Sequence, residues 1–110
     1  MYQLISEHSI YQYFGDDDPD MIKTMIQIIL DTNIHDLKEL TIFYEKNDFV
    51  TIKKRIHKAK PTMSYIGALS SKKLLESIEE NIQDSIQLNE QLQFNLIEIE
   101  KELREFLNKI

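Results

Sequence analysis

Apolar residues recur every three or four positions along most of this 110-residue chain. This spacing gives an α-helix one apolar face. The most regular stripe contains Phe49, Ile52, Ile56, Ala59, Met63 and Ile66. Taken over the whole chain, the pattern predicts helices at about residues 5–14, 19–46, 49–66, 71–84 and 92–110.

The residues between the first and second predicted helices suit the end of one helix and the start of the next. Gly15 ends the first predicted helix, because glycine tolerates the left-handed backbone that often follows a helix. Asp18 is a natural N-cap, and Pro19 fits the first turn after it. We therefore interpret the acidic run at residues 16–20 as a helix start rather than as a metal site.

Similar signals separate the later helices. Asn47 and Asp48 supply a turn and an N-cap, and Gly67 supplies the next helix stop. Ser70 or Ser71 is expected to cap the helix that follows. The polar run at residues 31–33 is a weak point in the long second helix, but nothing in it compels a break.

The predicted fold class is all-α. Long amphipathic helices with short connections pack as an antiparallel up-down four-helix bundle, here with a short additional N-terminal helix. Residues 1–110 form a single domain. With only two glycines and two prolines, the chain lacks the turn residues of a β-rich fold and the glycines of a nucleotide-binding loop.

The composition narrows the function classes further. The chain has no cysteine, so a disulfide framework and a cysteine-ligated metal site are excluded. No apolar run is long enough to span a bilayer, and the net charge of −6 disfavours general binding to nucleic acid or anionic membranes. We expect a cytoplasmic protein that binds neither nucleic acid nor membrane.

One basic segment stands out in this acidic chain. Five of the eight residues at positions 53–60 are Lys or Arg, and His57 lies among them. On a helical wheel His57 lies roughly 130° from the centre of the apolar stripe, so it should face water. Lys53, Lys60, Pro61 and Ser64 lie within about 60° of it.

An exposed imidazole among ammonium groups suits phosphoryl chemistry. A neutral imidazole nitrogen is a nucleophile at physiological pH, and Lys60, one turn away, would neutralise phosphoryl oxygens. No carboxylate lies three or four residues from His57 on its own helix, so no general base is evident. The pattern indicates a phosphoryl acceptor and donor, not a site that drives its own reaction.

These residues resemble the histidine-phosphotransfer (HPt) domain family. The family pattern of a His, a Lys three residues later and a downstream aliphatic–Gly pair is matched by His57, Lys60 and Ile66-Gly67. The Asp18-Pro19 helix start and the turn at residues 47–49 also correspond. One departure is Pro61, where the family usually has glycine. Proline removes a helical hydrogen bond and crowds the carbonyl of His57, so we expect a local kink.

The resemblance implies reversible phosphoryl transfer between His57 and an aspartate of a response-regulator receiver domain, or a hybrid sensor histidine kinase. His57 is the phosphoacceptor and Lys60 stabilises the phosphoryl group. The docking residues are Lys53, Lys54, Lys58, Pro61 and Ser64. The chain itself would bind no metal or other cofactor, because the receiver supplies Mg²⁺, and it would act as a monomeric phosphocarrier without intrinsic kinase activity.

The alternative is a helical protein-interaction module of the same shape that performs no chemistry. The other histidines, His8 and His35, lack basic neighbours of this kind and are expected to be structural or solvated. Tyr65 and Met63 are expected to pack in or beside the core.

Overall fold

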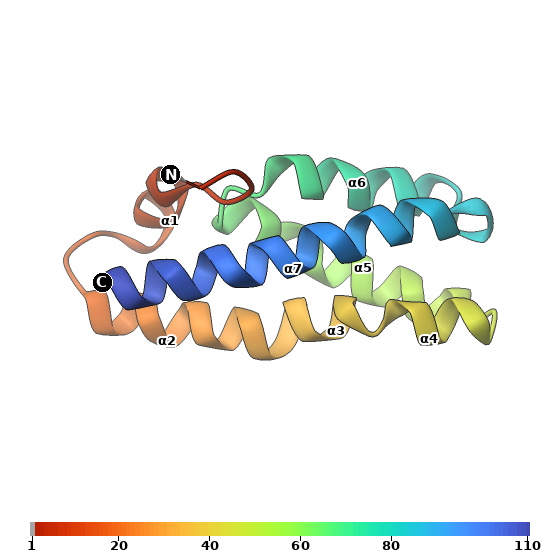
Figure 1. Cartoon of the computed structure of the whole chain (residues 1–110), viewed down its shortest axis with the longest axis horizontal. Helices are drawn as coiled ribbons and strands as arrows, with labels where there is room; N and C mark the ends of the chain where they lie inside the picture. The colour runs from red at the N-terminus through yellow and green to blue at the C-terminus, as the bar shows by residue number, and fades with distance from the viewer. Residues whose placement is uncertain (1) are drawn as a thin grey trace.

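The computed structural model describes residues 2–110, and in this part of the chain all regular structure is helical. The predicted all-α class is confirmed. The molecule is elongated, with principal extents of 44 × 21 × 19 Å (Figure 1). In chain order the elements are α1 (Glu7–Phe14), α2 (Pro19–Ile29), the π-helix η1 (Leu30–Ile34), α3 (His35–Lys38), α4 (Leu40–Glu45), α5 (Phe49–Tyr65), α6 (Leu69–Glu80), the 3₁₀-helix η2 (Ile82–Asp84) and α7 (Ile86–Lys109).

The long elements lie side by side along the longest axis. α2, η1, α3 and α4 follow one another along one edge, and α7 runs beside them (Figure 1). α5 packs against α6, α4 and η1, whereas α7 packs against α6, α2, α3 and α4. α4 and α6 each contact both α5 and α7 and lie between them. The solvent-exposed faces of α5 and α7 are therefore on different sides of the molecule.

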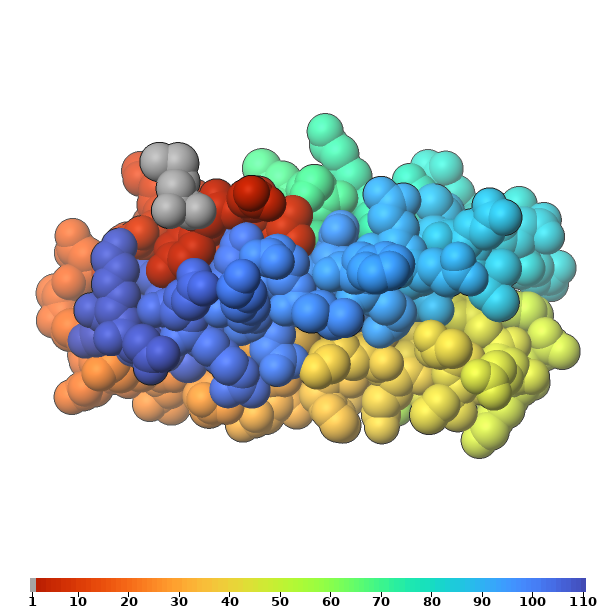
Figure 2. Space-filling view, viewed as in Figure 1, coloured from red at the N-terminus to blue at the C-terminus, as the bar shows by residue number. Residues whose placement is uncertain are grey.

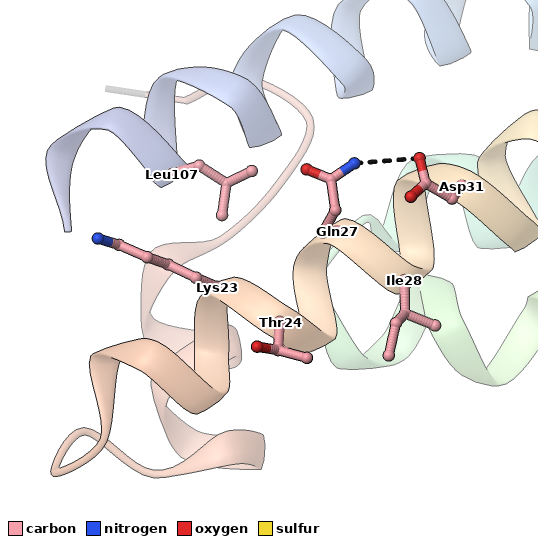
Figure 3. Close-up of a pocket in the computed structure, with 6 residues that line it drawn as sticks. All are labelled: Lys23, Thr24, Gln27, Ile28, Asp31 and Leu107. Atoms are coloured by element: carbon pink, nitrogen blue, oxygen red, sulfur yellow. Dashed lines mark hydrogen bonds between the residues drawn. The ribbon is translucent and has the colours of Figure 1, made fainter.

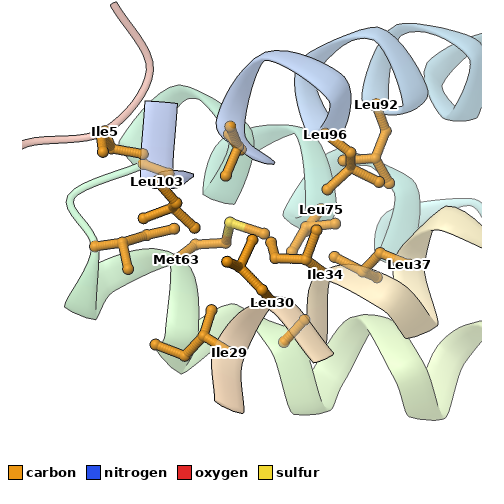
Figure 4. Packing of buried hydrophobic residues seen from close by; sticks show 14 of the residues in the cluster. Ile5, Ile29, Leu30, Ile34, Leu37, Met63, Leu75, Leu92, Leu96 and Leu103 are labelled. Atoms are coloured by element: carbon orange, nitrogen blue, oxygen red, sulfur yellow. The ribbon is translucent and has the colours of Figure 1, made fainter. Parts of the chain in front are cut away.

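The predicted apolar stripes form one core. Leu30, Ile34, Met63, Leu75 and Leu96 are all buried and come from four different segments of the chain (Figure 4). Burying a side chain of this size stabilises the fold by about 1.5–3 kcal/mol. The core therefore fixes which face of each helix is left for solvent.

Most of the predicted helix boundaries are confirmed. Gly15 and Gly67 have the positive φ angles of helix stops, 86° and 70°. Asp18 accepts a hydrogen bond of 3.0 Å from the backbone N–H of Met21. Asp48 accepts one of 3.2 Å from the backbone N–H of Thr51, and its pKa is lowered by its hydrogen bonds from Thr51.

The long second helix is not uniform, contrary to the prediction for residues 19–46. It widens into a π-helix at η1 and is interrupted again at Glu39, between α3 and α4. Within η1, Thr32 donates to the carbonyl oxygen of Ile28 at 2.7 Å, and Asn33 accepts from the hydroxyl of Thr62 on α5 at 2.8 Å. These side-chain bonds compete with regular α-helical geometry in a segment of weak helix propensity.

The predicted caps Ser70 and Ser71 were wrong. α6 begins at Leu69 with Ala68 at its N-cap position, because the turn at Gly67 is already closed by a 2.8 Å bond from the N–H of Ala68 to the carbonyl of Met63. Ser71 is instead buried.

The last connection is also shorter than predicted, since α7 begins at Ile86 rather than near Leu92. Polar residues in its first turn belong to the core: the hydroxyls of Ser85 and Tyr44 lie 2.6 Å apart, and Asn89 donates to Thr41 at 3.1 Å.

The N-terminal segment is held against the end of α7 by one carboxylate. Glu102 is buried and accepts hydrogen bonds from the backbone N–H groups of Gln3, Leu4 and Ile5, at 3.1, 2.9 and 3.0 Å. Burial by itself raises the pKa of Glu102, and these backbone donors outweigh it, so that the pKa is lowered overall.

Candidate functional site

His57 lies on the solvent face of α5, as its sequence position predicted. Ile56 and Ala59, on either side of it, are fully buried, and this fixes the rotation of the helix about its axis. The side chain of His57 is 78% exposed. An imidazole in this position is open to solvent.

A carboxylate that is distant in the sequence lies beside His57. Oε2 of Glu79, on α6, is 3.7 Å from Nδ1 of His57. Oε1 of the same carboxylate accepts a 2.6 Å hydrogen bond from the ammonium group of Lys60. His57, Lys60 and Glu79 thus form a cluster across the α5–α6 interface, and we call it the His57 cluster.

Lys60 is more enclosed than the sequence suggested. Its side chain is 25% exposed and that of Glu79 is 19% exposed, because α6 covers this flank of α5. The expectation of a freely exposed lysine was wrong for this reason. The ammonium group is still one turn from His57 on the same helix.

The open end of the His57 cluster continues as a surface hollow. Pro61 and Ser64 line it together with His57, as predicted, and α6 contributes Lys72 and Glu76. The ammonium of Lys72 donates a 2.8 Å hydrogen bond to the hydroxyl of Ser64. Ser64 therefore lies at the rim of the hollow. Its hydroxyl binds the ammonium group of Lys72, a second cation at the site that was not predicted from the sequence.

Aromatic side chains border the same hollow. Tyr65, which lines it, stacks on Tyr13 of α1 with ring centroids 3.8 Å apart and planes 16° from parallel. Met63 is fully buried in the core. The expectation that Met63 packs in the core is confirmed, whereas Tyr65 is half-buried and its ring stacks on the exposed Tyr13.

The remaining basic residues of α5 differ in their surroundings. Lys53, Lys54 and Lys58 are exposed, as docking charges would need to be. Lys53 also lines a second hollow between α5 and α6, together with Glu79. Arg55 faces the opposite direction: it donates to the carboxylate of Glu39 at 2.9 Å and makes no part of the site.

α5 remains helical through Pro61 and up to Tyr65. Pro61 is exposed beside His57, and the next residue, Thr62, is buried and bonded to Asn33 of η1. This cross-helix bond anchors the backbone directly after the proline. The expected local kink stays a prediction.

A different hollow lies between α2 and α7 (Figure 3). Lys23, Ile28 and Leu107 line it, and its carboxylate, Asp31, accepts a 3.0 Å bond from Gln27. It contains no histidine and is separate from the His57 cluster, so we assign it no chemistry.

The other two histidines, His8 and His35, lie on α1 and α3. His8 is exposed. His35 is 61% exposed, and its Nε2 lies 3.7 Å from Glu39, four residues further along the chain. Among residues 2–110 no three His, Asp or Glu side chains are grouped so that they could hold a metal ion.

Glu79 and Lys72 are the site residues that sequence reasoning missed. Both lie on α6, and together with Glu76 they follow the 4-3 spacing of one helix face. This spacing indicates that the three side chains share one polar face of α6. Nothing in the sequence indicates that this face borders His57, because that depends on how α6 packs against α5.

No protein-family model, curated protein or solved structure matches this chain. In the part of the chain that the structure describes, no helix is both long enough and apolar enough to cross a membrane.

Proposed function

We propose that this chain is a histidine-phosphotransfer domain that carries a phosphoryl group on His57. The observation that supports this most directly is the His57 cluster: an imidazole that is 78% exposed, next to an ammonium–carboxylate pair formed by Lys60 and Glu79. The proposal includes the finer architecture, an antiparallel up-down four-helix bundle with α1 as the additional short helix. In it α2 to α4 form one long member, and α5, α6 and α7 form the others.

The partner is the receiver domain of a response regulator, or a hybrid sensor histidine kinase, in the cytoplasm. The receiver supplies the phosphorylated aspartate and the Mg²⁺ held in its acidic pocket. This chain contributes the nucleophile and the cations around it, with Lys53, Lys54 and Lys58 attracting the acidic face of the partner. It is a phosphocarrier and not a kinase.

Glu79 selects the reactive nitrogen of His57. A carboxylate near Nδ1 favours the tautomer that has its proton on that nitrogen, and this leaves the Nε2 lone pair facing solvent. The separation of 3.7 Å is longer than a hydrogen bond, so Glu79 acts on the ring by its charge at this distance.

In the transfer step Nε2 attacks the phosphorus of the phosphoaspartate. The N–P bond forms while the bond between phosphorus and the aspartyl oxygen breaks, and that oxygen leaves as part of a carboxylate. The ring then carries the phosphoryl group on Nε2 and a proton on Nδ1. Its positive charge is opposed by Glu79, and the ammonium of Lys60 opposes the charge of the phosphoryl oxygens.

The test is to incubate the protein with a phosphorylated receiver domain and Mg²⁺ and to follow acid-labile, base-stable label. Wild type should be labelled and His57→Gln should not. His35→Gln is a matched control, because His35 is also exposed and also lies 3.7 Å from a glutamate. That glutamate, Glu39, is paired with Arg55 rather than with a lysine. His35→Gln should be labelled like wild type.

Two results would overturn the proposal. One is the absence of label on folded wild type with a panel of receivers. The other is equal labelling of His57→Gln and wild type. Binding of a receiver without labelling would favour the alternative, an interaction module that performs no chemistry.

Glu79→Gln tests the role of the carboxylate separately. Removing its charge should slow transfer roughly tenfold, which corresponds to about 1.4 kcal/mol of transition-state stabilisation. A rate equal to that of wild type would remove Glu79 from the mechanism while leaving His57 as the acceptor.

A further inference from the structure

The outward face of α7 carries large apolar side chains that the fold does not cover. Phe94 is 76% exposed, Ile97 is 64% exposed and Ile86 is 54% exposed. At about 100° per residue all three lie within roughly 80° of one another on the helix. Glu90 and Lys101 lie on the same face and are exposed. Ile86 lies one turn before Glu90, and we call the four residues Glu90, Phe94, Ile97 and Lys101 the α7 strip.

The flanks of α7 are used for packing, but the α7 strip is not. On one flank Asn95 donates to Ser71 of α6 at 3.3 Å. On the other, Gln93 donates to the carbonyl oxygen of Leu37 at 2.9 Å. The strip lies between these flanks, on the side of α7 opposite its buried residues Leu92, Leu96 and Ile99, and α7 runs uncovered across the face of the molecule in Figure 2.

The charges at the two ends of the strip have opposite sign and no partner within the described part of this chain. The ion pairs of α7 are made by other residues, such as Glu100 with Lys38 and Lys109 with Glu7. Glu90 and Lys101 are placed symmetrically about the Phe94–Ile97 pair: Phe94 is four positions after Glu90, and Lys101 is four positions after Ile97. The strip is therefore complementary to itself when reversed.

We infer that the α7 strip binds a second copy of this chain, with the two α7 helices antiparallel about a two-fold axis. Phe94 of each copy then lies opposite Ile97 of the other, and Glu90 lies opposite Lys101. The two-fold axis makes every contact occur twice, as in isologous dimers. The apolar pairs form the centre of the interface, and the two Glu–Lys pairs form its ends.

Like-charge or apolar–charged contacts disfavour other ways of pairing the two α7 helices. A parallel pair would bring Glu90 against Glu90 and Lys101 against Lys101. An antiparallel pair centred on Phe94 would bring Glu90 against Glu98. One centred on Ile97 would bring Phe94 against Glu100. Of these arrangements, the register centred between Phe94 and Ile97 pairs Phe94 with Ile97 and Glu90 with Lys101, and it leaves Ile86 opposite Glu105.

The interface is short, because Glu90 and Lys101 are only about 16 Å apart along the helix. A contact of this size is at the lower end of specific interfaces, so we expect a dissociation constant in the range of about 10–500 µM. This proposal replaces the monomer expected from the sequence. It does not depend on the proposed phosphotransfer, since the α7 strip and His57 lie on different helices that face different sides.

Analytical ultracentrifugation of the full chain over that concentration range tests the inference. Wild type should change from monomer to dimer. Phe94→Glu should sediment as a monomer throughout, and circular dichroism should show that it is folded, because the residue is exposed. A monomeric wild type at the highest concentration would overturn the inference.

A charge swap tests the register. Glu90→Lys alone and Lys101→Glu alone should each weaken dimerisation by about tenfold or more, because each places like charges opposite one another twice. The double variant Glu90→Lys/Lys101→Glu should dimerise within about threefold of wild type. Glu45→Lys, which makes the same change in net charge at an exposed residue on α4, should behave as wild type. A double variant no better than the singles, or an equal effect of Glu45→Lys, would refute the register.

Discussion

Glu102 provides the sharpest test of how the N-terminal segment is held. In Glu102→Gln one carboxylate oxygen becomes an amide NH₂ group, which cannot accept the bond from Gln3, while the other oxygen can still accept from Leu4 and Ile5. The variant loses one of three bonds and the charge that strengthens the other two. Hydrogen bonds to charged groups contribute about 1.5–3 kcal/mol each, so we expect a loss of about 2–4 kcal/mol in the free energy of unfolding.

The pH dependence follows from the lowered pKa of Glu102. A carboxyl group whose pKa is lower in the folded state than in the unfolded chain contributes stability at pH values above its unfolded pKa, for which the reference value is 4.5. That contribution is lost as the pH falls through the folded pKa. The stability of wild type should therefore fall in this acidic range, and that of Glu102→Gln should fall less.

Urea denaturation followed by circular dichroism, at neutral pH and at several acidic values, measures both effects. Glu105→Gln is the control, since Glu105 is exposed on the same helix and its loss should change stability by less than about 0.5 kcal/mol. If Glu102→Gln is as stable as Glu105→Gln, or if its pH profile matches that of wild type, the anchoring role is refuted.

Three further changes test other contacts. Gly67→Ala should destabilise the fold by about 2–4 kcal/mol in urea, because φ is +70° and a Cβ there would lie 2.4 Å from Cβ of Ser6; an unchanged midpoint would contradict this. Tyr44→Phe should cost about 1 kcal/mol in thermal unfolding through loss of its 2.6 Å bond with Ser85, and a stability equal to wild type would show that the bond contributes nothing. Lys60→Ala should slow phosphoryl transfer roughly tenfold yet lower stability by less than about 1 kcal/mol, since its ion pair is partly exposed; an unchanged rate would remove Lys60 from the site.

The helical segments were predictable from the sequence, because each one depends on the spacing of apolar residues within a short stretch of chain. The stripes that include Ile56, Ala59 and Leu96 are buried as their spacing indicated, and Gly15 and Gly67 end helices where the chain needs a positive φ. The errors fall where polar side chains bond across the core. In the π-helix η1, Asn33 accepts a hydrogen bond from Thr62 of another helix, and no local sequence pattern indicates such a bond.

The candidate site divides in the same way. The sequence by itself determined that the chain is helical and that His57, Lys53, Lys54 and Lys58 face outward, because 3.6-residue periodicity assigns each side chain of a helix to the core or to solvent. Only the tertiary structure decided that Glu79 lies beside His57 and Lys60, that Lys72 reaches Ser64, and that Phe94 and Ile97 remain uncovered. Periodicity fixes the faces of one helix, whereas the relative position of two helices depends on how their side chains pack.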